Sequence, residues 1–572
     1  MAPFPSDPAA SPGDGATAAA IPGEPEALRD GTTAGGLPAA PGFEAAERNS
    51  RRALLALLAA MAAWSAWFIG RSSFVVSGRR IFCLFEDAMI SMTYARSLVE
   101  GHGLNWARMG RPVEGFTHPL WVALMVPINA LPLDPRFRSL PVQLLSLAIL
   151  GLHVVLVRRV TLRFFATAGA RHWLPAALLT AFYYPLSYWS LMGLESGLQA
   201  LLTTASVLLA LDVVCRGEDR HRALLLLGAA AYLLRMDMVL MVLVVQLYVI
   251  AGGGLREPRQ RVSWLQGAAM FAALAAGYSV FRWITFGDLL PNTYYLKLYR
   301  IPLAVRLLRG SRSLWESLAD HLPLLAVTGA GVGVLLRHHP DRGWRRRLLL
   351  PASLVLTAFA YSVYVGGDAY EMLLNVRANR FTAYVMPQVF ILFNALINEA
   401  SARMPRLAGR RLAAAAAVLA LVSADGLWLA ADAAGNRRDL AVTRPPWTTA
   451  GQAAVYRAMI RLRDEIAPGS VVATACAGIP AYFSDFRMVD ELGYSDRHIA
   501  RLPPALPLGP DDYQLFQPGH VKWDVAYVLA RRPAAIVRCV GGGRFGDGRL
   551  LREAGYRYDA SGLVLLGPSV SP

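Results

Sequence analysis

Long apolar stretches alternate with short polar connectors along most of the chain. The first begins at Ala53, directly after Arg51 and Arg52, and continues to about Ile69. Roughly 20 apolar residues let a helix cross a membrane, so we expect a signal-anchor helix with its arginine pair in the cytoplasm. Eleven further stretches have a comparable pattern: 118–133, 140–157, 173–191, 195–214, 222–235, 237–252, 264–284, 321–337, 348–366, 381–398 and 411–431. The pattern predicts a polytopic α-helical membrane protein with about 11–13 transmembrane helices.

Connectors dense in arginine set the expected orientation. By the positive-inside rule they face the cytoplasm, and they lie at 216–222, 256–261, 337–347 and 403–411. An inner N-terminus and an outer C-terminus require an odd number of spans, whereas twelve segments are apolar enough. The weakest candidates are the short 118–133 run and the 222–252 stretch, which is interrupted by Arg235 and Asp237.

Composition divides the chain into three regions. Residues 1–50 are rich in Ala, Pro and Gly without apolar periodicity, so we expect a disordered N-terminal tail. Residues 51–432 form the transmembrane region, with a large first outer loop at 71–117. Residues 433–572 have ordinary polarity and predict a soluble α/β domain on the periplasmic, or extracytoplasmic, side.

The C-terminal region carries short strand-like runs at 470–474 and 535–537 beside a helical stretch at 452–466. It also holds Cys476 and Cys539, which either pair in an oxidising compartment or remain two buried thiols. The chain has four cysteines, none with metal-ligand spacing, so the sequence indicates neither a zinc site nor a disulfide framework.

The charge is positive and almost wholly arginine. The chain has 57 Lys and Arg against 40 Asp and Glu, which gives +17, with 55% hydrophobic and only 17% charged residues. This composition excludes a disordered protein, a small disulfide scaffold and an ordinary soluble enzyme. Topology explains most of the excess, and no basic and aromatic patch on a soluble module indicates a nucleic-acid partner. Two lysines stand out, Lys297 and Lys522.

An acidic pair, Glu86-Asp87, lies in the first outer loop. Met89, Ile90 and Leu98 recur after it at the spacing of an amphipathic helix, which we expect to lie flat at the membrane surface. Acids at a helix N-terminus complement the helix dipole. Alternatively, one of them is a general base at the place where a lipid-linked substrate presents its head group. The local pattern leaves both interpretations open.

The acidic pair is followed by YARSLVEGHGL at 94–104 and RPVEGFTHPLW at 111–121. Together they resemble the first outer loop of the GT-C superfamily of membrane glycosyltransferases. The chain is most similar to the branch with the mycobacterial terminal β-(1→2) arabinofuranosyltransferases. Further matches follow in the same order: 193–198, 235–237, 287–293 leading to Lys297, 365–368 followed by Arg380 and Phe381, 490–496 and 519–522. Two departures are the Glu-Asp pair, where relatives often have Asp-Asp, and a longer segment between Asp368 and Arg380.

The resemblance implies an inverting transfer of a sugar from a polyprenyl-phosphate donor to an acceptor outside the cytoplasmic membrane. The expected reaction moves arabinofuranose from decaprenyl-phosphoryl-arabinose to a cell-envelope glycan or glycoconjugate. Asp87 is then the base for the acceptor hydroxyl, and Glu86 orients it or holds a sugar hydroxyl. Lys297, Arg235 and Arg380 are the candidates for the donor phosphate, because cations aimed at developing negative charge are often the largest catalytic contribution.

Other ionisable residues are candidates for the cavity that holds the substrates. Ionisable groups near the hydrocarbon are costly and therefore often functional, although arginines at span ends also snorkel and acids also pair with them. The candidates are Glu195, Asp237, Asp368, His520 and Lys522. Almost every basic residue of this chain is arginine, so a lysine suggests a site that prefers a compact ammonium to a planar guanidinium.

The sequence leaves two alternatives in view. The same fold could use another lipid-linked sugar, such as mannose or aminoarabinose, to modify protein or lipid A. A transporter is a different class, but it predicts repeated halves, and the chain has no visible repeat. The expected partners are the lipid-linked donor, the glycan acceptor and membrane lipids. No cofactor is required by the sequence, although acidic residues near a phosphate can share a divalent cation.

Overall fold

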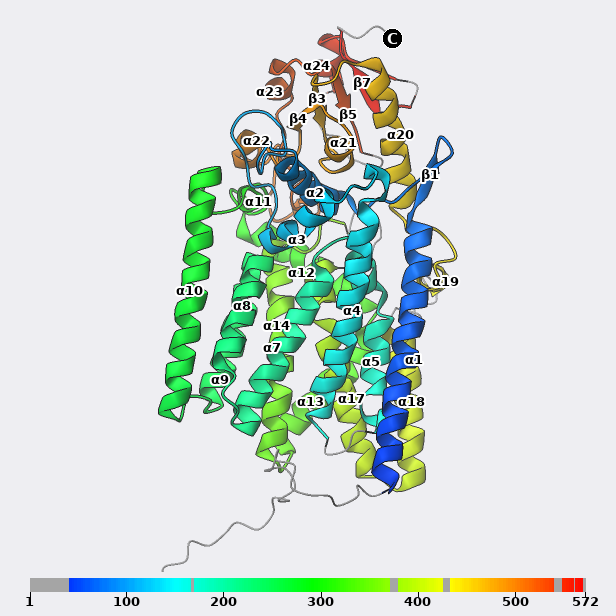
Figure 1. Ribbon diagram of the computed structural model, residues 1–572, viewed down its shortest axis with the longest axis vertical. Coiled ribbons are helices and arrows are strands. Elements are labelled where there is room, and N and C mark those ends of the chain that lie inside the picture. Colours follow the sequence, from blue (N-terminus) through cyan, green and yellow to red (C-terminus); the bar gives the residue numbers. More distant parts are fainter. Residues whose placement is uncertain are drawn as a thin grey trace, which may run out of the picture. The chain divides into compact units, whose positions relative to one another are not determined.

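The apolar stretches form helices that run alongside one another (Figure 1). The structure is a computed structural model, and it describes residues 41–165, 169–370, 379–424, 433–539, 548–559 and 561–568. Residues 46–572 form one compact unit. Among the described residues, five helices are long and apolar enough to cross a membrane: α1 (Pro41–Ser72), α4 (Ser139–Leu162), α7 (Ser196–Arg216), α10 (Pro258–Phe286) and α14 (Arg342–Val365).

Shorter helices complete the helical region. They are α3 (Pro119–Ala130), α5 (Leu174–Ala181), α6 (Tyr184–Leu191), α8 (His221–Leu234), α9 (Val239–Ala251), α12 (Leu303–Ala319), α13 (Leu322–His338), α17 (Met386–Ala402) and α18 (Arg406–Ala424). Helices α12 and α13 are bent by 98° at their junction and together are apolar enough for one further span. The fold is therefore the expected polytopic helical one. The total number of spans and the expected boundaries of the tail and domains remain predictions. Residues 1–40 of that tail lie outside the described residues, and α1 begins at Pro41.

Two expected segments differ in detail. The 173–191 stretch is not one helix, because α5 ends at Ala181 and α6 begins at Tyr184. Pro185 lies in the first turn of α6, and a continuous helix would lack the bond from its nitrogen to the Ala181 carbonyl. The 118–133 stretch forms only the 12 residues of α3, which pack chiefly against the neighbouring α2. Setting it aside leaves eleven expected spans, an odd number, as the orientation requires.

The expected amphipathic helix of the first loop is present as α2 (Glu86–Val99). Most of its residues are buried, because α3 covers it on one side and α21 (Ile479–Tyr482) of the C-terminal region on another. The helix therefore lies inside the protein rather than flat on a surface. The loop also forms a hairpin of β1 (Phe74–Val76) and β2 (Arg79–Ile81).

The C-terminal region contains a mixed five-stranded sheet in the order β4-β3-β5-β7-β6. Its strands are β3 (Val471–Thr474), β4 (Arg487–Asp490), β5 (Ala535–Val537), β6 (Arg557–Tyr558) and β7 (Val564–Leu566). Strand β3 is parallel to β4 and β5, with Val472 opposite Met488 and Ala535, whereas β7 is antiparallel to β5 and β6. The strand-like runs and the helical stretch of the sequence are confirmed.

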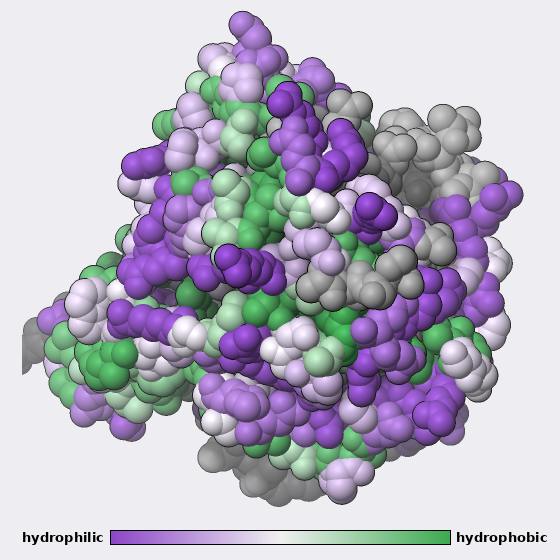
Figure 2. All heavy atoms as spheres, turned by 90° about the horizontal axis from the view of Figure 1, so that it is seen from above, coloured by the Kyte–Doolittle hydropathy of each residue, from purple (hydrophilic) through white to green (hydrophobic). Residues whose placement is uncertain are grey.

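Helices cover this sheet and link it to the helical region. They are α19 (Ala433–Leu440), α20 (Thr449–Glu465), α21, α22 (Arg497–Arg501), α23 (Val525–Ala530) and α24 (Gly548–Glu553). A disulfide joins Cys476 to Cys539, so the pairing alternative of the sequence is the one that the structure has. The face seen from the sheet end is mostly hydrophilic (Figure 2). Helix α10, by contrast, has exposed apolar side chains, and Ile284 among them is 73% exposed.

Hydrogen bonds and apolar packing fasten the C-terminal region to the first loop. The Trp106 indole donates to the Ala477 carbonyl at 2.7 Å, and Arg96 pairs with Asp485 at 2.7 Å. Buried apolar residues of both regions, such as Phe85 and Tyr482, belong to one continuous core. This shared core fixes the position of α2, whose first turn carries a cavity-lining residue, Asp87.

Candidate functional site

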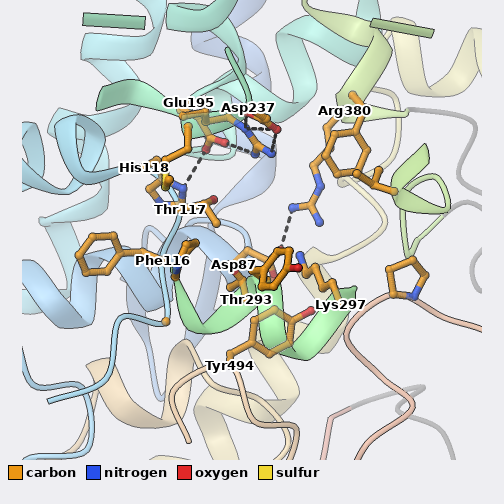
Figure 3. Close-up of a pocket in the computed structure, with 18 of the residues that line it drawn as sticks. Asp87, Phe116, Thr117, His118, Glu195, Asp237, Thr293, Lys297, Arg380 and Tyr494 are labelled. Atoms are coloured by element: carbon orange, nitrogen blue, oxygen red, sulfur yellow. Dashed lines mark hydrogen bonds and ion pairs between the residues drawn. The ribbon is translucent and has the colours of Figure 1, made fainter. Parts of the chain in front are cut away.

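A cavity of about 230 Å³ lies where α2, α11 (Asn292–Lys297) and α16 (Arg380–Ala383) meet the ends of α7, α8 and α14 (Figure 3). Its wall is mixed, with apolar side chains and a concentration of ionisable ones. The charged and titratable residues that line it are Asp87, His118, Glu195, Arg235, Asp237, Tyr294, Lys297, Tyr361, Arg380 and Tyr494. Six of the ten residues expected at the site therefore share one cavity.

Asp87 lies in the first turn of α2, where an acid complements the helix dipole. Its carboxylate pairs with Arg380 at 2.7 Å and accepts a hydrogen bond from the Tyr370 hydroxyl at 2.9 Å. Burial alone would raise the pKa of Asp87, but the charges of Arg380 and Lys297 and these hydrogen bonds outweigh it and hold the pKa below its usual value. Asp87 is therefore ionised and able to accept a proton.

A glycine turn after α14 places Asp368 beside Arg380. Gly366 and Gly367 have φ of 91° and 74°, and a Cβ at Gly367 would overlap Ser313 and Arg309. The left-handed backbone favours glycine at both positions, and the close approach of α12 excludes a side chain at Gly367. The buried Asp368 then lies 3.2 Å from the Arg380 Nε. Arg380 is held between two carboxylates, which fixes its guanidinium at the cavity.

A second ion cluster forms the opposite wall. Arg235, at the end of α8, pairs with Glu195 at 2.8 Å and with Asp237 at 2.7 Å. His118 lies 3.6 Å from Glu195 and shares a 2.5 Å hydrogen bond with the Ser91 hydroxyl. Glu195 therefore forms the structural ion pair with Arg235 that the sequence left open as an alternative to a role at the site. The same groups also face the cavity, so pairing does not exclude contact with a substrate.

Lys297 differs from the two arginines, because its ammonium forms no ion pair with any residue in the described part of the chain. Its Nζ lies 5.3 Å from the centre of the Tyr494 ring. The side chains of Lys297 and Arg380 both point toward Asp87 (Figure 3). Burial and the charge of Arg380 lower its pKa to about 8. The charges of Asp87 and Asp368 act on Lys297 without a direct ion pair, and an anionic ligand in the cavity would contact its ammonium directly.

Comparison with known proteins bears on this geometry. The C-terminal residues 447–561 match the family model "Domain of unknown function (DUF8728)". No curated protein matches the chain. Among solved structures, it is similar to ArnT from Cupriavidus metallidurans bound to undecaprenyl phosphate, with 12% identity and a TM-score of 0.55 over 90% of this chain and 97% of ArnT. The apo state of the same protein has 13% identity and a TM-score of 0.53, over the same 90% of this chain and 97% of ArnT. The chain has the GT-C membrane fold.

An oligosaccharyltransferase from Archaeoglobus fulgidus is a more distant likeness, with 12% identity and a TM-score of 0.44 over 77% of this chain and 64% of that one. Identities this low concern the fold alone. The narrower likeness to mycobacterial arabinofuranosyltransferases remains a prediction from the motifs, and so do the roles of the individual residues.

Four of the ten expected site residues do not line the cavity: Asp368, which pairs with Arg380, and Glu86, His520 and Lys522. Glu86 accepts hydrogen bonds from the backbone N–H groups of Gly478 and Ile479 at 2.7 and 3.1 Å, so it ties α2 to α21. Burial raises its pKa to about 7. His520 has its ring 6.4 Å from that of Tyr370 and hydrogen-bonds the Pro518 carbonyl at 3.1 Å, and burial lowers its pKa to about 4.

Lys522 is fully buried and donates to the carbonyls of Tyr295, Tyr299 and Ala500 at 2.7–2.9 Å. Three carbonyls use the three donors of an ammonium, so a planar guanidinium would not fit. The lysine signal in the sequence therefore has a structural explanation at Lys522. It fastens the segment around α11 to the C-terminal region and holds Lys297 at the cavity.

The structure also shows site residues that the sequence reasoning did not single out. Tyr370 and Tyr494 flank Asp87 and Lys297, and Glu114 forms a buried pair with Arg282 at 2.5 Å. Glu114 and His118 are part of the 111–121 motif, which was the available signal. The described residues contain no group of three or more His, Cys, Asp or Glu side chains that could hold a metal ion.

Proposed function

We propose that the protein is an inverting glycosyltransferase that uses a polyprenyl-phosphate sugar. The observation that carries the proposal is the grouping of an ionised Asp87 with Arg380 and Lys297 in one cavity, where Lys297 has no ion-pair partner among the described residues. Its support from outside the chain is the fold shared with ArnT, a protein whose structure holds undecaprenyl phosphate. Transfer to a hydroxyl needs a base, a cation for the departing phosphate and room for a lipid.

Lys297 and Arg380 are the phosphate ligands in this proposal. Both line the cavity beside Asp87, and Lys297 has no carboxylate partner among the described residues. A phosphate bound to Lys297 would place a negative charge in direct contact with its ammonium and so stabilise the charged form, which burial disfavours. Phosphate on Arg380 would compete with Asp87 for the guanidinium, and this would raise the basicity of Asp87 when the donor is bound.

Asp87 is the base. The acceptor oxygen attacks the anomeric carbon of the donor while the bond from that carbon to the phosphate oxygen breaks, and polyprenyl phosphate leaves. The acceptor proton passes to the Asp87 carboxylate. Attack and departure on opposite faces invert the configuration of the anomeric carbon. Glu195, Arg235 and Asp237 form the far wall, where they can hydrogen-bond the hydroxyls of a sugar.

The lipid chain needs a path from the cavity to an apolar surface. Leu290 and Tyr294 line the cavity and are still 37% and 38% exposed. Helix α12, which follows α11 in the chain, also has exposed apolar side chains, namely Leu307, Leu308 and Trp315. We propose that the donor's polyprenyl chain leaves the cavity here, beside α11.

We place the site on the periplasmic side of a bacterial cytoplasmic membrane. The arginine-dense connectors favour the opposite end as the cytoplasmic one, and the Cys476–Cys539 disulfide suits an oxidising compartment. For the donor we propose decaprenyl-phosphoryl-arabinose and for the acceptor a cell-envelope glycan, on the sequence motifs. The same cavity could take lipid-linked aminoarabinose or mannose, and a donor panel decides between them.

The test uses the purified full-length protein in liposomes with radiolabelled decaprenyl-phosphoryl-arabinose and a glycan acceptor. Asp87→Asn removes the base, and Asp464→Asn changes an exposed acid of α20 as the matched control. We expect transfer by the wild type and the control, and a loss of about 10²- to 10⁴-fold in Asp87→Asn. Equal activity of the two variants would refute the assignment of the base. Failure of every donor in the panel would refute the function.

A further inference from the structure

A second cavity, of about 790 Å³, lies between the first loop and the C-terminal region. Four arginines line it: Arg111 of the loop, Arg497 and Arg501 of α22, and Arg531 directly after α23. The proposed reaction uses none of them. Four arginines around one cavity repel one another unless negative charges balance them.

The arginines outnumber the carboxylates that can balance them. Arg497 and Arg501 share a single acid, Asp288, at 2.8 and 2.7 Å. Neither Arg111 nor Arg531 forms an ion pair with any residue that the structure describes. The cavity therefore keeps a surplus of positive charge.

Two carboxylates line the cavity themselves, but both are already engaged. Asp490 accepts hydrogen bonds from three backbone N–H groups at 2.7–3.1 Å, and burial raises its pKa to about 7. Asp496 accepts from the Tyr527 hydroxyl at 2.8 Å and from two backbone N–H groups at the start of α22. Neither is directed at an arginine, so the cations remain available to an external anion.

The cavity wall also contains aromatic rings. The rings of His498 and Tyr527 stack with their centres 4.2 Å apart, the Arg531 guanidinium lies 4.2 Å from the centre of the Tyr527 ring, and all three residues line the cavity. Aromatic rings that combine an apolar face with a polar edge suit ligands that are polar on one side and apolar on the other. A sugar ring has this character, since it presents C–H groups on its face and hydroxyls around its edge.

A thin wall separates this cavity from the one that holds Asp87. Val113 and Ser495 line the second cavity, whereas Gly115 and Tyr494 line the first. The Tyr94 hydroxyl fastens the wall, since it donates to the Val113 carbonyl at 2.6 Å and lies 3.2 Å from the Ser495 hydroxyl. The two cavities are therefore adjacent, and an extended acceptor that passes around this wall would span both.

We infer that the second cavity binds an anionic segment of the acceptor, a glycan that carries carboxylate or phosphate groups. The reacting hydroxyl of the same acceptor then reaches Asp87 in the first cavity. The inference rests on the proposed transferase function and names the chemical class of its acceptor. Electrostatic attraction also brings such a polymer to the cavity in the correct orientation.

The test is equilibrium binding to the full-length protein in detergent, measured by calorimetry without donor. The probes are trigalacturonic acid, a trimer of glycerol phosphate, and the neutral maltotriose. We expect at least one anionic probe to bind about tenfold more tightly than maltotriose, and the preference to fall with added salt. The stronger of the two anionic probes identifies the group as carboxylate or phosphate.

Substitutions locate the binding. Arg531→Gln and Arg497→Gln should each weaken binding of the preferred anionic probe about fivefold. Arg557 is an exposed arginine of β6, and Arg557→Gln should leave this binding unchanged. Size-exclusion profiles identify any variant that misfolds. Arg531 forms no ion pair among the described residues, so Arg531→Gln alters only its contacts with Tyr527. Equal binding of maltotriose, an unchanged constant in both cavity variants, or an equal loss in Arg557→Gln would overturn the inference.

The two proposals fail separately. Binding is measured without donor, so anion binding without sugar transfer from any donor refutes only the transferase. Transfer without a preference for anions refutes only the anionic acceptor.

Discussion

Replacing Lys297 by methionine removes the one cavity cation that has no acidic partner among the described residues, and keeps much of its length. If Lys297 holds the donor phosphate, the loss is that of a hydrogen bond to a charged group, about 1.5–3 kcal/mol, and the Coulomb contribution in a half-buried site brings it toward about 4 kcal/mol. We therefore expect kcat/KM to fall by about 10- to 1,000-fold.

The same substitution should leave the fold intact. Because burial lowers the pKa of Lys297 to about 8, from 10.5 for a free lysine, its charge opposes folding below pH 8, and that cost disappears between pH 8 and 10.5. Lys297→Met should then unfold at the same temperature as the wild type or a higher one at pH 7. A purely structural lysine would show the opposite change.

The pH profile gives an independent readout. In the free enzyme Lys297 loses its proton near pH 8, so kcat/KM of the wild type should decline above that pH. Arginine does not deprotonate in this range, so Lys297→Arg should be less active at neutral pH but lack the decline. The assay is initial-rate transfer from the radiolabelled donor in liposomes, with thermal unfolding of the same samples. Retention of kcat/KM within about threefold in Lys297→Met, or an activity loss that follows lost folded protein, would refute the reasoning.

Three further substitutions test the supports of the site. Lys522→Met leaves three buried carbonyls without a donor, so thermal unfolding should show a loss of about 2–4 kcal/mol, and Lys522→Arg should not restore it. Burial raises the pKa of Glu86 to about 7, so between pH 4.5 and 7 the unfolded chain loses this proton while the folded protein retains it, and stability falls as the pH rises. The unfolding temperature of Glu86→Gln should therefore fall less than that of the wild type across this interval. Glu114→Gln breaks the buried pair with Arg282 and should cost about 3–5 kcal/mol, whereas Glu114→Gln with Arg282→Met should cost less than the sum of the single changes, as a double-mutant cycle of unfolding would measure.

The adjacent acids Glu86 and Asp87 show how far the sequence leads and where it stops. Their place at the start of a helix was predictable, because apolar spacing defined α2. Consecutive residues of a helix point about 100° apart, so only one of the two can face a given cavity. Which one does so depends on the position of α21, whose residues are almost 400 positions away in the chain. Local pattern contains no information about that contact.

The helices show the same limit in another form. Hydropathy located the long apolar segments, since burial in lipid needs a continuous apolar surface. It did not reveal α12, because Arg306, Arg309 and Arg312 lower the average of a helix whose exposed side is apolar. Composition drew attention to Lys297 and Lys522 equally. Only the packing shows that the first faces a cavity and the second is held by three carbonyls.

The contact between Glu86 and α21 restricts how this protein can change over evolutionary time. One turn of α2 holds the C-terminal region through Glu86 and reaches the reaction cavity through Asp87. A Cβ at Gly478 would lie 2.2 Å from the Glu86 carbonyl oxygen and 2.8 Å from the Met89 side chain. A C-terminal region exchanged from a relative would need a residue without a side chain at this point. The two regions therefore have to change together at this contact, and an exchange that shifts α21 would also shift the turn of α2 that carries Asp87, the proposed base.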